Sequence, residues 1–142
     1  MYLSRLHISK FRVFDDITLY FKNGINILIG ENNSGKTAII DALRICLGCG
    51  KPDNFIYVQD GDLHVNPENP SEINTVIQFD LIFEFGDASI ERECFYDFIS
   101  QDKDNPDKQT IQLHLKFIQE NNGKKKYFKR IIWGGDLSLI HI

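Results

Sequence analysis

The sequence predicts an α/β protein, and three features carry that prediction. Several stretches alternate apolar with polar residues, as strands with one buried face do. A glycine-rich octet, GENNSGKT at residues 30–37, lies between an apolar stretch and a stretch of helical periodicity. Near the C-terminus, the turn signal NNG at 121–123 separates two strand-like stretches. We therefore expect one βαβ-like unit together with a large share of antiparallel strand.

The first third of the chain predicts three strands and a helix. Residues 6–11 and 17–21 alternate and predict two short strands. The apolar stretch INILIG at 25–30 predicts a compact strand that is buried on both sides. The period then becomes helical, and Gly48 and Gly50 mark the end of that helix. The apolar residues at helical spacing are Ile39, Ile40, Leu43 and Leu47.

The remainder predicts a loop, a strand, a short helix and a hairpin. Residues 50–72 are rich in turn formers and predict a long surface loop. Residues 74–85 predict a strand, 89–100 a short helix, and 110–120 with 124–133 a hairpin. The apolar face of the strand holds Ile77, Phe79, Leu81, Phe83 and Phe85. Its solvated face holds Gln78, Asp80 and Glu84. One side of the predicted helix holds Ile90, Cys94, Phe95 and Phe98.

Composition is that of an ordinary soluble protein. The 142 residues suffice for one domain, with 42% hydrophobic and 25% charged residues. The net charge of −4 gives no global attraction to nucleic acid or to an anionic membrane. The N-terminus lacks the apolar core of a signal peptide, and no apolar run reaches the length of a membrane span. Three cysteines without an export signal fit a reducing compartment, so we expect a cytoplasmic location.

The octet satisfies the phosphate-loop pattern GxxxxGK[ST]. Its glycines let the backbone turn tightly and bring N–H groups to phosphate oxygens, and the following helix adds unpaired N–H donors. Lys36 supplies a charge for the β- and γ-phosphates, and the Thr37 hydroxyl is a hard oxygen ligand for Mg²⁺. The alternative is a glycine-rich turn without a ligand. The predicted nucleotide-binding residues here are Gly30, Asn32, Asn33, Ser34, Gly35, Lys36 and Thr37. The polar variable positions do not by themselves select ATP or GTP.

Residues 6–48 together resemble the N-terminus of the SMC/RecF/OLD group of ABC-type ATPases. In that group an opening strand leads into a turn, here KFRVF at 10–14, and a second strand leads to the phosphate loop. The form GENNSGKT resembles most closely the OLD-type ATP-dependent endonucleases. DGDLH at 60–64 and WGG at 133–135 are also compatible with that family.

The resemblance implies a P-loop NTPase fold of the ABC/SMC type and ATP with Mg²⁺ as cofactors. It implies a homodimer through the ATPase heads that sandwiches the nucleotide, and DNA as a partner of the full-length protein. It also places Arg12 near the nucleotide; the alternative for Arg12 is an exposed turn residue.

Other parts that hydrolysis requires are not found in the sequence. The chain has no apolar strand ending in Asp-Glu to hold Mg²⁺, and no Toprim acidic cluster. In the resembled family both lie further downstream. We therefore expect residues 1–136 to be the N-terminal part of an ATPase domain that is inactive alone.

We expect residues 137–142, LSLIHI, to be a non-native tail, because CTGTCTCTTATACACATC encodes them and matches a transposon end used for sequencing libraries. The alternative is a genuine strand.

Three further groups of residues carry weaker signals. Cys46 and Cys49 form a CxxC pair, which we interpret as ordinary packing at a helix end because a zinc site needs more ligands. The histidines at 7, 64, 114 and 141 show no metal or catalytic spacing. The basic stretch at 124–130 either contacts a nucleic-acid backbone or protects a hairpin edge against aggregation.

Three functions remain open on the sequence. The leading hypothesis is the ATP-binding part of an OLD-type endonuclease that acts in DNA repair or phage defence. The second is a RecF- or SMC-like DNA repair ATPase without a nuclease. The third is a nucleotide-binding module that regulates a partner without hydrolysis.

Overall fold

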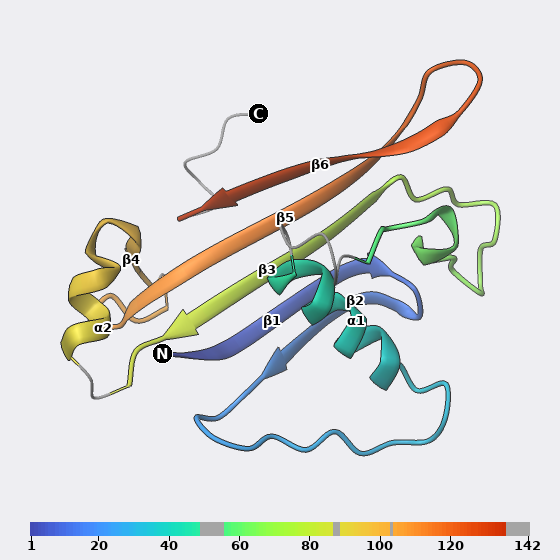
Figure 1. The fold of residues 1–142 in the computed structure, drawn as a ribbon. Coiled ribbons are helices and arrows are strands. Elements are labelled where there is room, and N and C mark those ends of the chain that lie inside the picture. The colour runs from blue at the N-terminus through green and yellow to red at the C-terminus, as the bar shows by residue number, and fades with distance from the viewer. Residues whose placement is uncertain (49–55, 87–88, 103, 136–142) are drawn as a thin grey trace.

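The protein is built on one twisted antiparallel sheet (Figure 1). The computed structural model describes residues 1–48, 56–86, 89–102 and 104–135. The strands are β1 (Tyr2–Phe11), β2 (Phe14–Tyr20), β3 (Val76–Glu84), β4 (Ile99–Gln101), β5 (Gln109–Asn121) and β6 (Lys126–Gly134). Their order is β2-β1-β3-β5-β4, and β6 pairs with β5. Each pairing is antiparallel.

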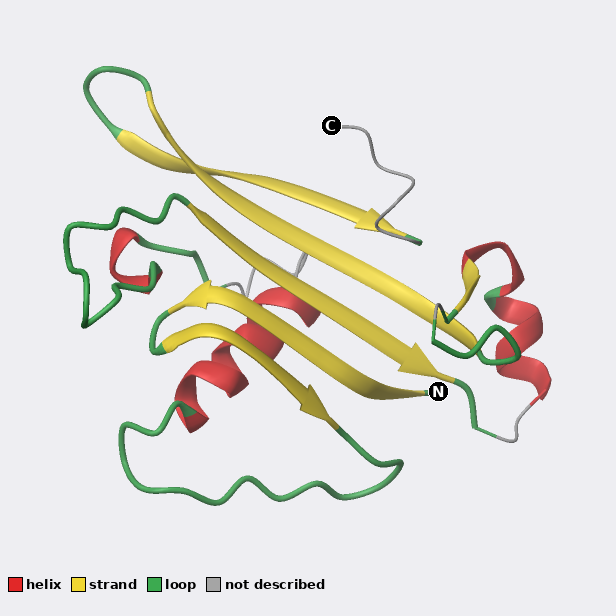
Figure 2. Ribbon diagram, turned by 180° about the vertical axis from the view of Figure 1, so that it is seen from behind, coloured by secondary structure: helices red, strands yellow, loops and turns green. Residues whose placement is uncertain are grey.

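Helix α1 (Lys36–Leu47) lies on one face of this sheet, as the two opposite views in Figures 1 and 2 show. Its buried residues are Ala38, Ile39, Ala42, Ile45 and Cys46. They join a core with fully buried sheet residues that include Leu6, Ile8, Phe79, Leu81 and Leu115. Phe79 lies edge-to-face against Phe11 at 5.1 Å between ring centroids. The burial of this one face of the sheet accounts for the alternation in β1, β3 and β5.

Several predictions from the sequence are confirmed. The first two strands meet in a tight turn at residues 12–13, and α1 ends at Gly48, whose N–H bonds the Arg44 carbonyl. The β5–β6 hairpin turns at Asn122 and Gly123, the latter with φ 88°. Among the described residues of the predicted 50–72 loop, only a 3₁₀ turn at Asp60–Asp62 and an isolated bridge are regular. The residues 49–55 and 136–142, with the predicted roles of Cys49, Gly50 and the tail, lie outside the described residues.

The segment 25–30 is not a strand, which corrects both the buried-strand prediction and the βαβ-like unit. No described strand pairs with it. Ile25, Ile27 and Ile29 are 93%, 77% and 92% exposed. Apolar composition favours an extended segment, but a strand also needs a neighbour for its backbone groups. In the described part of the chain that neighbour is absent.

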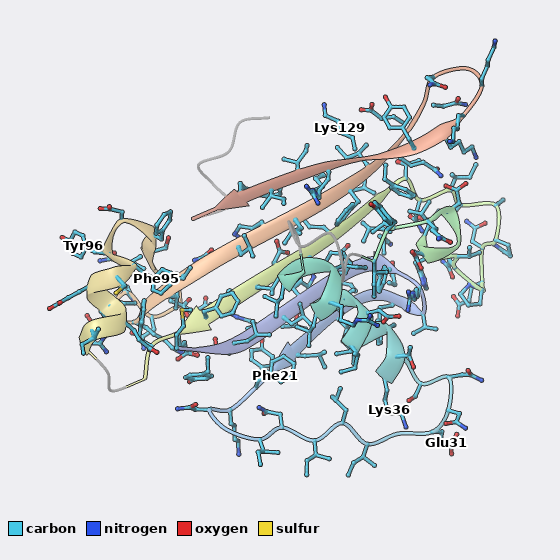
Figure 3. The ribbon with its side chains drawn as sticks, in the orientation of Figure 1. Phe21, Glu31, Lys36, Phe95, Tyr96 and Lys129 are labelled. Atoms are coloured by element: carbon cyan, nitrogen blue, oxygen red, sulfur yellow. The ribbon has the colours of Figure 1, made fainter. Side chains whose placement is uncertain are left out.

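The predicted helix at 89–100 is only partly helical. Helix α2 covers Ser89–Cys94, a 3₁₀ turn covers Tyr96–Phe98, and the chain then enters β4. Ile90 and Phe98 are 72% and 64% exposed. Figure 3 shows Phe95 and Tyr96 at the end of this small unit, away from the sheet core. The apolar side predicted here is therefore not a core face. The predicted face of α1 also differs, because Ile40 and Leu47 are about half exposed.

Asp80 is buried rather than solvated. Its β3 position is paired with His7 on β1 and with His114 on β5. Asp80 Oδ2 lies 2.7 Å from His7 Nδ1, and Asp80 Oδ1 lies 2.6 Å from His114 Nδ1. Gln78 donates a further hydrogen bond to the same carboxylate. The expectation of a solvated face failed because histidines on both neighbouring strands meet this carboxylate.

Candidate nucleotide-phosphate site

The octet forms a sharp turn into α1. The Ser34 hydroxyl and backbone N–H both donate to the Glu31 carbonyl, at 2.7 and 3.2 Å. Asn33 and Gly35 have φ of 69° and 101°, in the left-handed region that favours glycine. The bent backbone of the loop is therefore maintained by two left-handed residues and by two hydrogen bonds to one carbonyl.

Gly35 is required at its position for two reasons. Its φ is positive, and a Cβ there would lie 2.3 Å from Cζ of Phe14, at the start of β2. The β1–β2 turn therefore packs directly on the phosphate loop. Gly30 is less constrained, since a Cβ there would meet the Ser34 hydroxyl at 2.7 Å, and that side chain can rotate away.

The start of α1 offers donors to an anion. Gly35 is the N-cap and makes no side-chain capping bond, and no acidic residue lies in the first turn. Unpaired N–H groups and the helix dipole therefore give this end a partial positive charge. Lys36 folds back over the loop, where its Nζ donates to the Gly30 carbonyl; Figure 3 shows it between α1 and the loop that carries Glu31.

A cavity of about 230 Å³ brings the predicted residues together. Its lining consists of Arg12, Val13, Asn32, Asn33, Gly35, Lys36, Thr37 and Ala38. The predicted residues Gly30 and Ser34 are not in the lining; they shape the loop behind it. The cavity is therefore formed by two elements, the phosphate loop with the start of α1 and the β1–β2 turn.

Arg12 is held at this cavity by two carboxylates. Its Nη1 donates to Asp41 on α1 at 2.5 Å, and its Nε donates to Asp62 at 2.9 Å. The guanidinium lies over the Phe11 ring, 4.8 Å from the centroid. Burial opposes the charge, but the hydrogen bonds to Asp41 and Asp62 outweigh it and raise the pKa of Arg12. Arg12 is a permanent, oriented cation beside the loop.

The residues present fit a nucleotide phosphate with Mg²⁺. Phosphate is matched by the helix N-terminus, Lys36 and Arg12. Mg²⁺ commonly takes one or two protein oxygens and completes its shell with phosphate oxygens and water, and the exposed Thr37 hydroxyl can provide one. Within the described ranges, no group of three or more His, Cys, Asp or Glu side chains could hold a metal by itself.

Three residues of this site were missed or set aside on sequence grounds. Asp41 and Asp62 hold the Arg12 guanidinium, and His64 donates from Nδ1 to the Arg12 carbonyl at 2.7 Å. The helical spacing that puts Asp41 one turn after Thr37 was the available signal for the first. Nothing in the sequence spacing of Asp62 and His64 indicated that they contact Arg12, about fifty residues earlier in the chain. Cys46 is buried in α1, in agreement with the packing interpretation.

Comparison with known proteins places this sequence in a family. Residues 5–137 match the family model described as AAA domain. The DNA replication and repair protein RecF of Limosilactobacillus reuteri (strain DSM 20016) is 42% identical over 45 residues, which are 32% of this chain and 12% of that protein. The DNA double-strand break repair Rad50 ATPase of Thermoplasma volcanium is 40% identical over 47 residues, 33% of this chain and 5% of that protein. The chain therefore spans a small part of the length of these relatives.

A solved structure shows the same fold. It comes from work on the "structural biochemistry of ATP-driven dimerization and DNA stimulated activation of SMC ATPases", and it matches with a TM-score of 0.55 and 16% identity. The match covers 92% of this chain and 69% of that one. The fold is accordingly that of the N-terminal lobe of an ABC/SMC-type P-loop ATPase, as the sequence predicted. Among the described residues, no helix combines the length and apolar character needed to cross a membrane.

Proposed function

Because this chain belongs to the AAA domain family, we propose that it binds ATP with Mg²⁺ as one lobe of a DNA repair ATPase of the RecF/Rad50/SMC type. One observation carries the proposal: Arg12, Lys36 and the start of α1 line a single cavity. Three sources of positive charge there converge on a space suited to phosphate groups. The names of the relatives, a DNA replication and repair protein and a DNA double-strand break repair ATPase, support the assignment to DNA repair.

The geometry supports a binding role for each of these groups. The N–H groups of the loop and of the start of α1 donate to phosphate oxygens. Lys36 exchanges the Gly30 carbonyl for a phosphate oxygen, which is the better partner because it is charged. The Thr37 hydroxyl is the ligand that this lobe offers to Mg²⁺, an ion that offsets phosphate charge when bound.

Hydrolysis needs groups that are not found among the described residues lining this cavity. Among the described residues that line it there is no carboxylate, and phosphoryl transfer requires one to hold Mg²⁺ and a group to orient water. We propose that residues 1–136 act with a further lobe and with a second copy that closes over the nucleotide. The related solved structure concerns ATP-driven dimerization of SMC ATPases, which supports a homodimer through the heads. A cytoplasmic location is part of this proposal.

The experiment that tests ATP binding is a titration of the full chain with a fluorescent ATP analogue and Mg²⁺. We expect Lys36→Ala to raise the Kd at least about tenfold, since it removes one charge-assisted bond. Lys22→Ala is the matched control, because Lys22 is exposed and lies outside the cavity lining. A wild-type chain that binds no ATP, or a Lys36→Ala variant with unchanged Kd, would contradict the proposal.

DNA is the proposed partner, and the exposed lysines at 124–126 on the β5–β6 turn are the basic group available to meet it. Lys129 extends the group along β6 (Figure 3). Charge reversal of Lys124, Lys125 and Lys126 to Glu should weaken DNA binding by the complete protein and flatten its salt dependence. Reversal of the exposed Lys22 is the control. If the variant with the three glutamates binds DNA normally but aggregates, the lysines instead protect the strand edge.

An OLD-type endonuclease is the second candidate function. The loop form GENNSGKT favours it, as does the DGDLH segment, which the structure brings to Arg12. Cleavage of DNA by the complete protein would support this candidate, and ATP-dependent DNA binding without cleavage would support the first. A third candidate, a module without hydrolysis, predicts ATP binding with no phosphate release by the complete protein.

A further inference from the structure

The segment 60–64 is fastened to the β1–β2 turn by four hydrogen bonds. The Arg12 N–H donates to the Asp62 carbonyl at 2.7 Å, and the His64 N–H donates to the Lys10 carbonyl at 3.1 Å. His64 Nδ1 donates to the Arg12 carbonyl, and Arg12 Nε donates to the Asp62 carboxylate, at 2.7 and 2.9 Å. An isolated bridge joins the residues between them, Phe11 and Leu63. These contacts join segments about fifty residues apart in sequence.

The turn that is held in this way has an unfavourable backbone. Lys10 and Arg12 have φ of 58° and 51°, in the left-handed region that a Cβ disfavours. Neither is a glycine, so the conformation persists only where surrounding contacts impose it. The hydrogen bonds to the Arg12 N–H and carbonyl come from Asp62 and His64. His64 is 8% exposed, so its bond to Arg12 is shielded from competing water.

One of these contacts, the bond to the Asp62 carboxylate, also orients the guanidinium, together with Asp41 and Phe11. Asp62 accepts from Nε and Asp41 from Nη1, while the Phe11 ring supports one face. Among the described residues, no hydrogen bond is formed by Nη2 of Arg12. Arg12 lines the cavity of the phosphate loop, so the remaining donors are available at that cavity. A flexible arginine on a surface turn would lose side-chain entropy on binding phosphate, and this one has already lost it.

We propose that Asp62 and His64 are positioning residues for Arg12, which they hold ready to bind a phosphate group of the nucleotide. The proposal rests on the proposed function, because it needs a phosphate in the cavity. Asp62 acts through the guanidinium and through the backbone of the turn. His64 acts through the backbone alone, so its effect on the ligand depends wholly on Arg12.

Substitutions with matched controls separate positioning from folding. His64→Leu removes the donor to the Arg12 carbonyl, whereas His64→Asn keeps an N–H donor at the position of Nδ1. Asp62→Asn weakens the grip on Arg12, and Asp60→Asn removes a charge from the same 3₁₀ turn, where Asp60 contacts Gln119 instead. Asp60→Asn therefore controls for the general effect of removing a negative charge near an anion site.

The measurement is the Kd for the ATP analogue with Mg²⁺ in the full chain, with the unfolding midpoint of each variant. We expect Arg12→Ala to raise the Kd about tenfold and His64→Leu about fivefold, with His64→Asn near wild type. Asp62→Asn should bind more weakly than Asp60→Asn. In the Arg12→Ala background, His64→Leu and Asp62→Asn should have no further effect, because the group that they position is gone.

Two results overturn the inference. One is an unchanged Kd in both His64→Leu and Asp62→Asn. The other is an equal loss with and without Arg12, which would show a general structural role. Both are distinct from failure of the proposed function, in which the wild-type chain binds no ATP or Lys36→Ala binds normally. Failure of the proposed function removes this inference as well.

Discussion

Asp80 on β3 and His114 on β5 face each other across an antiparallel pair, with Asp80 Oδ1 and His114 Nδ1 2.6 Å apart. His114 Nε2 lies 2.9 Å from the Gly135 carbonyl, and the His114 ring stacks on Trp133 at 5.3 Å. On the other side of Asp80, His7 bonds Asp80 through Nδ1. A polar row thus crosses β1, β3, β5 and β6 on the face of the sheet opposite α1.

The protonation of His7 predicts a pH-dependent stability. Both ring nitrogens face carboxylates, Nδ1 toward Asp80 and Nε2 toward Asp16, and carboxylates only accept. Burial opposes the charge on His7, but these two hydrogen bonds outweigh it and raise its pKa above 6.5. The stabilisation is therefore complete below about pH 6.5 and is lost as pH rises through the raised pKa. We expect the free energy of unfolding of the wild type to fall as pH rises from about 6.5 through the raised pKa of His7.

Urea unfolding across that range measures the effect. His7→Gln cannot titrate, so its free energy of unfolding should change less over the same interval. Asp80 contributes at the acid end, because bonds from His114 and His7 outweigh its burial and lower its pKa. Its stabilisation is present above about pH 4 and is lost as pH falls through the lowered pKa. If the free energy of unfolding changes equally with pH in the wild type and in His7→Gln above about pH 6, folding does not raise the pKa of His7.

Removing the Asp80 carboxylate should destabilise the sheet strongly. Asp80→Ala leaves His7 and His114 without their shared partner, and breaking a buried pair in this way costs about 3 kcal/mol. Asp16→Ala is the control, since its side chain is 67% exposed and its bond to His7 is worth less than about 1 kcal/mol. At neutral pH, Asp80→Ala should therefore lower the free energy of unfolding by about 2 kcal/mol more than Asp16→Ala does. Similar losses of free energy of unfolding in the two variants would mean that the buried hydrogen bonds of Asp80 stabilise the sheet no more than the exposed bond of Asp16 does.

The two glycines of the phosphate loop should respond differently to alanine. At Gly35 the positive φ and the contact with Phe14 predict a loss of about 2 kcal/mol or more for Gly35→Ala. Gly30→Ala should cost less than about 1 kcal/mol, because Ser34 can rotate out of the way. Thermal or urea unfolding of both variants gives the comparison. An equally small loss at Gly35 would require the β1–β2 turn to move away from the loop.

The exposed isoleucines ahead of the loop should contribute little to stability. Ile29 is 92% exposed, so Ile29→Ala should change the free energy of unfolding by no more than about 0.5 kcal/mol. Ile77 is fully buried, and Ile77→Ala should cost about 3 kcal/mol. Both changes remove the same atoms, so unfolding of the two variants isolates burial. A large loss at Ile29 would show that segment 25–30 packs as the sequence predicted.

The local elements of the chain could be read from the sequence because their causes are local. Residues close in sequence determine these elements. They include the alternation in β1 and β3, the NNG turn and the helix end at Gly48. The octet is a second case, since the pattern of glycine, lysine and threonine determines a loop shape and a charge at the start of a helix. The predicted length of the helix at 89–100 was too great. Periodicity shows that a segment is amphipathic, but it does not show whether its apolar face packs against another element.

By itself, the sequence determined the phosphate loop, the helix after it, the hairpin and the family resemblance that placed Arg12 near the loop. Only the tertiary structure decided what holds Arg12, that Asp80 is buried, and that segment 25–30 pairs with none of the described strands. The contacts of Arg12 and of Asp80 depend on strand register and join residues from 29 to 73 positions apart. Such contacts form only when the sheet has assembled, and so a local pattern of residues does not contain them.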